Sequence, residues 1–254
     1  MDLTTVSTWR TPEGRAGLAL APGETYVAGG TWLFSEPQPG VTGLVDLAAL
    51  GWEPWEELPG GGLRIAATCT VADLQRAPWP EQVAGLVRSC ADALLMSWKV
   101  QGAATVGGNL ALALPAGAMT SLFAGLGATA VLWTAEGERS VPAAKLITGA
   151  GTTALGPGEL IRAVDVPASS LAARTAFRRV SLADRGRSAA VVVGRTTSAD
   201  PVVTVTASTP RPVVLADPAE LASVEWYADP HGAADWRAAQ TRRLVAEVLQ
   251  ELSG

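Results

Sequence analysis

Two glycine pairs, each followed by a small polar residue, constrain this chain more than any other feature. They lie in Val27–Leu33 (VAGGTWL) and Thr105–Leu110 (TVGGNL). A glycine pair after a strand lets the main chain turn sharply, and its N–H groups can approach a phosphate closely because no Cβ atom intervenes. One such pair is most simply a turn, but two of the same type predict a two-sided clamp on a pyrophosphate. Neither segment matches a Walker loop or G-x-G-x-x-G, so a Rossmann fold is not indicated.

Composition excludes several classes of partner. The chain has 254 residues, 48% of them apolar and 17% charged, with a net charge of −5. These values are typical of a globular chain with a sizeable core and two or three subdomains. The longest apolar stretch, 122–133, is about half of a bilayer span, and the first residues lack a basic segment followed by an apolar one, which predicts a cytoplasmic protein without a membrane span. Without a basic run, no nucleic-acid partner is expected.

The rarest residues limit the chemistry further. His231 is the single histidine, and Cys69 and Cys90 are the only cysteines. They cannot form an iron–sulfur or His-rich metal site by themselves, so no metal ligand is predicted in this chain. Both thiols are expected to be buried and structural, and His231 is expected in a turn or cap before the last helix rather than in catalysis. We therefore expect any chemistry to come from a bound cofactor held mainly by main chain.

The pattern of apolar residues predicts an α+β fold in three parts: 1–58, 59–168 and 169–254, with a seam at the 59–62 breaker (PGGG). Helices are predicted at 70–76, 80–96, 120–126, 218–224 and 232–252. Strands are predicted at 25–28, 43–50, 63–67, 128–134, 159–166, 188–195 and 202–208. The last part is interpreted as a sheet packed by helices on one face.

Six segments then carry a family resemblance: AGGTWL at 28–33, LVDL at 44–47, ATVGGNLA at 104–111, PAGA at 115–118, GELI at 158–161 and DPHGAADWR at 229–237. In this order they resemble the FAD-binding medium subunit of the molybdenum hydroxylases, the family of xanthine dehydrogenase and aerobic carbon monoxide dehydrogenase. The resemblance runs from about Val27 to the C-terminus. It implies a two-subdomain, PCMH-type FAD-binding fold followed by a C-terminal three-stranded antiparallel sheet with helices.

The resemblance also implies a function. This chain would be an FAD-dependent oxidoreductase subunit, similar to that of xanthine dehydrogenase, that passes electrons from iron–sulfur clusters through FAD to an acceptor such as NAD or oxygen. The molybdenum cofactor and [2Fe-2S] clusters would belong to a large and a small partner subunit. The residues carried over as FAD contacts are Tyr26, Val27, Ala28, Gly29, Gly30, Thr31, Trp32, Leu33, Thr105, Val106, Gly107, Gly108, Asn109, Ala118, Ile161 and Arg178.

Some positions depart from the family pattern. Trp32 replaces the common Asp of the first loop, Gln101 and Gly102 replace an Arg-Asn pair, and Ala118 replaces the acidic residue that binds an adenosine hydroxyl. Losing that carboxylate removes a charge-assisted hydrogen bond, which predicts an FAD affinity lower by roughly ten- to a hundredfold. Trp32 would either stack on a cofactor ring or cover an apolar wall. The alternative function is therefore a flavin-poor scaffold subunit, and neither the substrate nor the acceptor can be read from this sequence.

Overall fold

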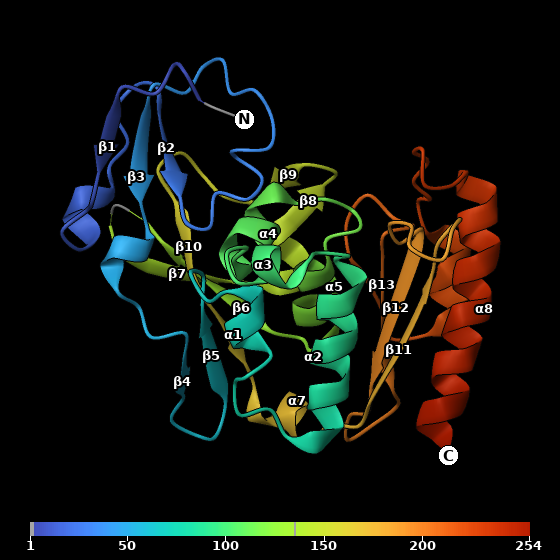
Figure 1. Cartoon of the computed structure of the whole chain (residues 1–254). Coiled ribbons are helices and arrows are strands. Elements are labelled where there is room, and N and C mark those ends of the chain that lie inside the picture. Colours follow the sequence, from blue (N-terminus) through green and yellow to red (C-terminus); the bar gives the residue numbers. More distant parts are fainter. Residues whose placement is uncertain (1–2, 135) are drawn as a thin grey trace.

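The computed structural model describes residues 3–134 and 136–254. At one end of the molecule, three short strands form a parallel sheet in the order β1 (Thr8–Arg10), β3 (Gly43–Asp46) and β2 (Glu24–Val27) (Figure 1). The predicted strand at 43–50 ends at Asp46, because its Oδ1 accepts a hydrogen bond from the Ala48 N–H (2.9 Å) and the chain turns into a 3-10 helix, η2 (Ala48–Leu50). The strand β2 leads directly into the first glycine pair.

The central sheet is antiparallel, in the order β4 (Trp55–Glu57), β5 (Leu63–Ala66), β10 (Leu160–Val166), β6 (Thr129–Trp133) and β7 (Glu138–Pro142). Strands β5, β6 and β10 follow the predictions from apolar periodicity. The edge strands β4 and β7 were not predicted, because their side chains are largely polar and exposed. An ion pair between Arg64 Nε and Asp165 Oδ1 (2.6 Å) joins β5 to β10.

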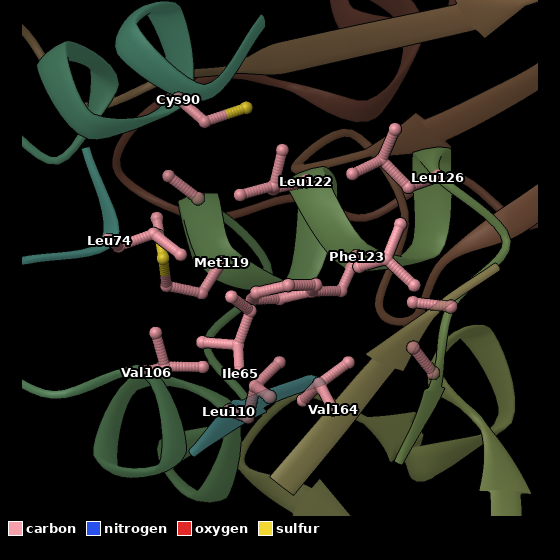
Figure 2. Packing of buried hydrophobic residues seen from close by; sticks show 14 of the residues in the cluster. Ile65, Leu74, Cys90, Val106, Leu110, Met119, Leu122, Phe123, Leu126 and Val164 are labelled. Carbon is pink, nitrogen blue, oxygen red and sulfur yellow. The ribbon is translucent and has the colours of Figure 1, made fainter. Parts of the chain in front are cut away.

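Helix α5 (Ala118–Gly125) lies at the centre of the main hydrophobic core, and every one of its residues is buried. Figure 2 shows Phe123 of this helix between the side chains of the central sheet and those of helix α2 (Glu81–Ala93). Fully burying a side chain of this kind contributes about 1.5–3 kcal/mol relative to its exposure. Helix α4 (Val106–Leu112) packs against the same core through Val106 and Leu110.

The C-terminal sheet differs from the prediction in two ways. It has four strands rather than three, in the antiparallel order β11 (Thr175–Val180), β12 (Ala190–Arg195), β13 (Val202–Thr206) and β14 (Val213–Leu215). It is also covered on both faces rather than one: α8 (Ala234–Ser253) packs on one side, and α2 and α5 on the other (Figure 1). Consecutive residues of β12 are therefore buried. The strand lacks the alternation of apolar and polar residues that marks a sheet with one buried face.

The remaining elements are short: η1 (Arg15–Leu18), α1 (Val71–Leu74), α3 (Trp98–Gln101), α6 (Ala143–Leu146), β8 (Ile147–Gly149), β9 (Thr152–Thr153), α7 (Ala168–Leu171) and η3 (Pro218–Ser223). Two of these were predicted, α1 within 70–76 and η3 within 218–224, whereas the others are too short to carry a periodic pattern. The predicted helix at 218–224 forms as η3, with a capping box between Asp217 and Glu220. Within the described residues, no helix has the length and apolar character needed to cross a membrane.

Candidate functional site

A cleft of about 730 Å³ lies where the first glycine segment, helix α4 and the C-terminal part of the chain meet. This volume is within the range of about 300–1,000 Å³ that is usual for ligand pockets. All of Tyr26, Val27, Ala28, Gly29, Gly30, Thr31, Trp32 and Leu33 line it, together with Thr105, Gly108 and Asn109. The fold thus brings both predicted glycine segments to a single cleft.

The first glycine segment presents free main-chain donors. Phe34 N–H donates to the Gly30 carbonyl (2.8 Å), and Gly30 has a φ of +65° that closes this turn. From Gly29 to Leu33, no main-chain N–H has an acceptor within residues 3–134 and 136–254. Successive unpaired N–H groups in a turn form a concavity that suits an anion.

The second glycine segment has a different structure from the one predicted. It is the first turn of helix α4, capped by the Thr105 hydroxyl, which accepts from the Gly108 N–H (3.2 Å). Val106 N–H donates to Cys69 O (2.9 Å), Gly107 N–H to Ala67 O (2.8 Å) and Asn109 N–H to Thr105 O (3.0 Å). Four successive main-chain donors are therefore already satisfied within the chain. In this conformation the second segment cannot offer a row of free N–H groups.

The glycines of the second pair have separate structural roles. A Cβ at Gly107 would lie 2.6 Å from the Ala67 Cβ and 2.9 Å from the Ala67 carbonyl oxygen, so Gly107 allows α4 to pack closely on the end of β5. A Cβ at Gly108 would meet only the Thr105 hydroxyl, at 2.9 Å. Gly108 lines the cleft and Gly107 does not. Gly107 therefore supports the site by packing, and Gly108 leaves space for a ligand.

Asn109 presents a side-chain donor to the same cleft. Its Oδ1 accepts a hydrogen bond from the Met119 N–H (3.1 Å), which ties α4 to the start of α5. This contact fixes which end of the amide is the acceptor and leaves the Nδ2 hydrogens for a ligand. Tyr26 is fixed similarly, because its hydroxyl donates to the Leu18 carbonyl (2.7 Å).

Four further residues carried over from the resemblance lie away from the cleft lining. Val106 and Ala118 are in the main core, and Ile161 is buried on β10. Arg178 on β11 pairs instead with α8, with Nη2 2.7 Å from Glu251 Oε2 and Nε 3.4 Å from Glu247 Oε2. A role of these residues in cofactor binding stays a prediction. Trp32 does line the cleft and is partly buried.

Sequence reasoning missed a third wall of the cleft. Its residues come from the β11–β12 loop and from the turn before α8: Arg187, Ser188, Tyr227, Asp229 and His231. His231 sits in the predicted turn, with its main-chain N–H donating to Asp229 Oδ1 (2.7 Å). The 229–237 motif is apparent in the sequence, but its residue spacing does not indicate that it faces the cleft.

Arg237 of α8 supports this third wall from behind. Its side chain is fully buried, and its guanidinium donates to Asp229 Oδ1 (2.5 Å) and to the carbonyl oxygens of Tyr227 and Ala207 (both 3.1 Å). A buried cation is tolerated only when it is paired and hydrogen-bonded in this way. Arg237 thus ties the last helix to the turn that closes the cleft.

The two thiols lie outside the cleft lining. Burial raises the pKa of Cys69 to about 12, and burial also raises the pKa of Cys90. Both side chains are free and buried, so neither is available as a thiolate near neutral pH. Among the described residues, no three His, Cys, Asp or Glu side chains are grouped as metal ligands would be.

The family model for the FAD binding domain in molybdopterin dehydrogenase matches residues 15–169, which is more than half of the chain. The chain belongs to this family. FAD is the cofactor that the family binds, and the predicted α+β FAD-binding fold is confirmed. The match covers both glycine segments and the central sheet, and the third wall of the cleft lies beyond it.

Solved structures of the same fold cover nearly the whole chain. Quinoline 2-oxidoreductase from Pseudomonas putida 86 matches with a TM-score of 0.81 and 22% identity, over 99% of this chain and 98% of that one. Carbon monoxide dehydrogenases from Hydrogenophaga pseudoflava (97% of each chain) and Oligotropha carboxidovorans (99% of each chain) both match with a TM-score of 0.82 and 21% identity. No curated protein gives a significant match. At these identities the structural likeness establishes the fold.

Proposed function

We propose that this FAD-binding domain holds FAD in the cleft and serves as an electron-transfer subunit of a molybdenum hydroxylase complex. It would receive electrons from iron–sulfur clusters of a small partner subunit, with the molybdenum cofactor in a large one. The acceptor would be NAD, oxygen or another oxidant. The carbon monoxide dehydrogenases and quinoline 2-oxidoreductase that share the fold support this assignment. We place the complex in the cytoplasm.

One observation carries the proposal: the N–H groups from Gly29 to Leu33, which have no acceptor in the described part of the chain, lie in the lining of a cleft of about 730 Å³ in a member of this family. The pyrophosphate of a dinucleotide is the chemical group that such a row of donors accepts best. Main-chain donors in a tight glycine turn are fixed before the ligand arrives, so little conformational entropy is lost on binding.

The residues of this chain bind and orient rather than react. Gly108 leaves room for the cofactor, and the Nδ2 group of Asn109 can donate to it from helix α4. The hydroxyl oxygen of Thr105 accepts the capping hydrogen bond from the Gly108 N–H, and its hydroxyl hydrogen can donate to a ligand. Bound flavin would supply the redox chemistry, accepting and releasing electrons.

A flavin-poor scaffold subunit is the second candidate, and a specific observation favours it. The main-chain donors of Val106 to Asn109 already have acceptors, so half of the predicted pyrophosphate clamp is missing. Position 118 carries no carboxylate, and Ala118 is 3% exposed in the core. If the first segment alone binds too weakly, the fold would be retained for assembly only.

FAD content decides between the two candidates. The purified 254-residue chain would be incubated with FAD, desalted and denatured, and the released flavin measured by its visible absorption. The electron-transfer proposal expects close to one FAD per chain, which is lost in Gly108→Leu because the new side chain fills the cleft. Gly85→Leu is the matched control, because Gly85 is also helical but has open space around it. A folded wild-type chain without bound FAD would refute the first candidate.

A test of the electron-transfer role requires the complex assembled with its partner subunits. Purification through a tag on this chain should recover two further subunits with iron and molybdenum, and substrate added without an acceptor should bleach the flavin absorption. If flavin is present but is not bleached while the molybdenum subunit is reduced, the chain binds FAD without serving as the electron exit.

A further inference from the structure

The third wall of the cleft carries a positive charge that no ion pair neutralises within the described residues. Arg187 is the one Arg or Lys side chain among the described residues that line the cleft. It has neither a hydrogen-bond nor an ion-pair partner within residues 3–134 and 136–254. Its position in the β11–β12 loop leaves it exposed at the rim.

The acidic residue on the same wall does not offset Arg187. Asp229 Oδ1 accepts from both the Arg237 guanidinium (2.5 Å) and the His231 N–H (2.7 Å). The charges of Asp229 and Arg237 cancel locally, because the two are directly paired. The cleft is therefore left with one uncompensated positive charge, at Arg187.

The surroundings of Arg187 suit a flat, hydrogen-bonding ring better than a phosphate. The rings of Tyr227 and His231 lie on the same wall, and the Arg237 guanidinium lies 5.8 Å from the centroid of the Tyr227 ring. Among the described residues, neither the Tyr227 hydroxyl nor the His231 imidazole has a hydrogen-bond partner. Arg237 fixes the backbone of this turn through the Tyr227 carbonyl (3.1 Å). The first glycine segment already offers a row of donors for the pyrophosphate. The ring end of the dinucleotide is thus the part for which the third wall supplies contacts.

We propose that Arg187 contacts the isoalloxazine ring of bound FAD at its carbonyl edge and favours the reduced form. Addition of two electrons and one proton to the oxidised ring places hydrogen on N5 and a negative charge at the N1–O2 edge. A cation close to this edge attracts the reduced ring more than the neutral oxidised one, and charge near N1 is a known lever on flavin potential. This inference rests on the proposed function, since it requires FAD in the cleft.

The size of the effect follows from the exposure of Arg187. A unit charge about 4 Å away in a water-like environment changes a binding constant by roughly one order of magnitude, and salt weakens the effect. We expect Arg187→Gln to weaken binding of reduced FAD about tenfold more than binding of oxidised FAD. For a two-electron couple this lowers the midpoint potential of the bound flavin by about 30 mV.

The test measures the midpoint potential of FAD bound to the full chain by reductive titration against a reference dye. Arg187→Gln should lower the potential, Arg187→Lys should restore most of it, and added salt should shrink the difference. Arg185→Gln is the matched control: it removes the same charge two residues away, from an exposed side chain that does not line the cleft. An equal shift in both Gln variants would show a general field effect and overturn the proposal.

A second measurement locates the contact along the cofactor. FMN carries the isoalloxazine ring, whereas ADP carries the pyrophosphate and adenine. Arg187→Gln should weaken reduced FMN and leave ADP unchanged; weaker ADP binding would place Arg187 on the phosphates instead and overturn the proposal. If the wild-type chain binds no FAD, the proposed function itself fails. If it binds FAD but Arg187→Gln leaves the potential unchanged, only the present inference fails.

Discussion

Gly29 lies directly against the main chain of Ala103: a Cβ added at Gly29 would be 1.7 Å from the Ala103 carbonyl oxygen. This contact joins the turn after β2 to the residues that lead into α4. Backbone atoms cannot move aside as a flexible side chain can. The two glycine segments are therefore held together by direct contact as well as by a shared cleft.

Gly29→Ala should separate these two segments. We expect a loss of about 1–3 kcal/mol of unfolding free energy from overpacking, together with loss of FAD retention. Denaturant unfolding and flavin release would measure the two effects. Gly40→Ala is the control, since a Cβ at Gly40 meets nothing within 4 Å. Wild-type stability in Gly29→Ala would mean that the close contact is relieved at no cost.

The two glycines at the start of α4 should respond differently to alanine. Gly107→Ala should cost about 1–3 kcal/mol, because the methyl group meets the main chain and side chain of Ala67. Gly108→Ala should change the unfolding free energy by less than about 1 kcal/mol, because the higher helix propensity of alanine offsets the cost of displacing the Thr105 hydroxyl. Parallel urea titrations would measure both. Equal destabilisation would contradict the separate roles assigned to them.

Removal of the buried cation should be among the costliest single changes in the C-terminal part. Arg237→Met should lower the unfolding free energy by about 3–5 kcal/mol, because it leaves the Asp229 carboxylate without its counter-ion and two carbonyl groups without the guanidinium donor. The double variant Arg237→Met/Asp229→Asn should recover part of this loss. Arg243→Met, on the exposed side of α8, removes an i,i+4 pair with Glu247 and hydrogen bonds to Gln240, all exposed to solvent, and should cost less than about 0.5 kcal/mol. Equal costs for Arg237 and Arg243 would contradict the buried clamp.

Acid should weaken the N-terminal sheet through Glu24. The Arg10 guanidinium and the Ala21 N–H lower the pKa of Glu24 from 4.5 to about 2. A carboxyl group with a depressed folded-state pKa stabilises the fold fully above its unfolded-state pKa, and this contribution is lost as the pH falls through the folded-state value. The stability difference between wild type and Glu24→Gln should therefore shrink between pH 4.5 and 2. Arg10→Gln should remove most of this pH dependence and leave the smaller part that comes from the Ala21 N–H, and unfolding titrations across that range would show it.

Sequence periodicity was most informative where one face of an element is buried. The amphipathic pattern predicted α2 and α8, and α8 begins at Ala234, two residues after the predicted start. The same method left the second face of the C-terminal sheet unseen, because both faces of β12 are apolar. It also missed β14, which has three residues and one buried side chain. A pattern of three residues is too short to show which side chains face the core.

Within the site, too, the sequence predicted where the glycine pairs lie but not the separate role of each glycine. Their composition was sufficient to predict two segments at one cleft, and with the neighbouring motifs it indicated the family. It could not distinguish Gly107, which packs on Ala67, from Gly108, which faces the cleft. Both are glycines in the same motif, and only their neighbours in space differ.

By itself, the sequence determined the α+β class, the FAD-binding family and the two segments at the cleft, because these follow from local patterns and motif order. Only the tertiary structure decided which donors are free. Within residues 3–134 and 136–254, the N–H groups of Gly29 to Leu33 have no acceptor, whereas the Gly107 N–H donates to the carbonyl of Ala67, forty positions earlier in the chain. The third wall also depended on the fold, since Arg187 comes from the β11–β12 loop, whereas Tyr227 and His231 come from the turn that the buried Arg237 holds. Hydrogen-bond partners far apart in sequence leave no local pattern, so these features emerged only from the folded chain.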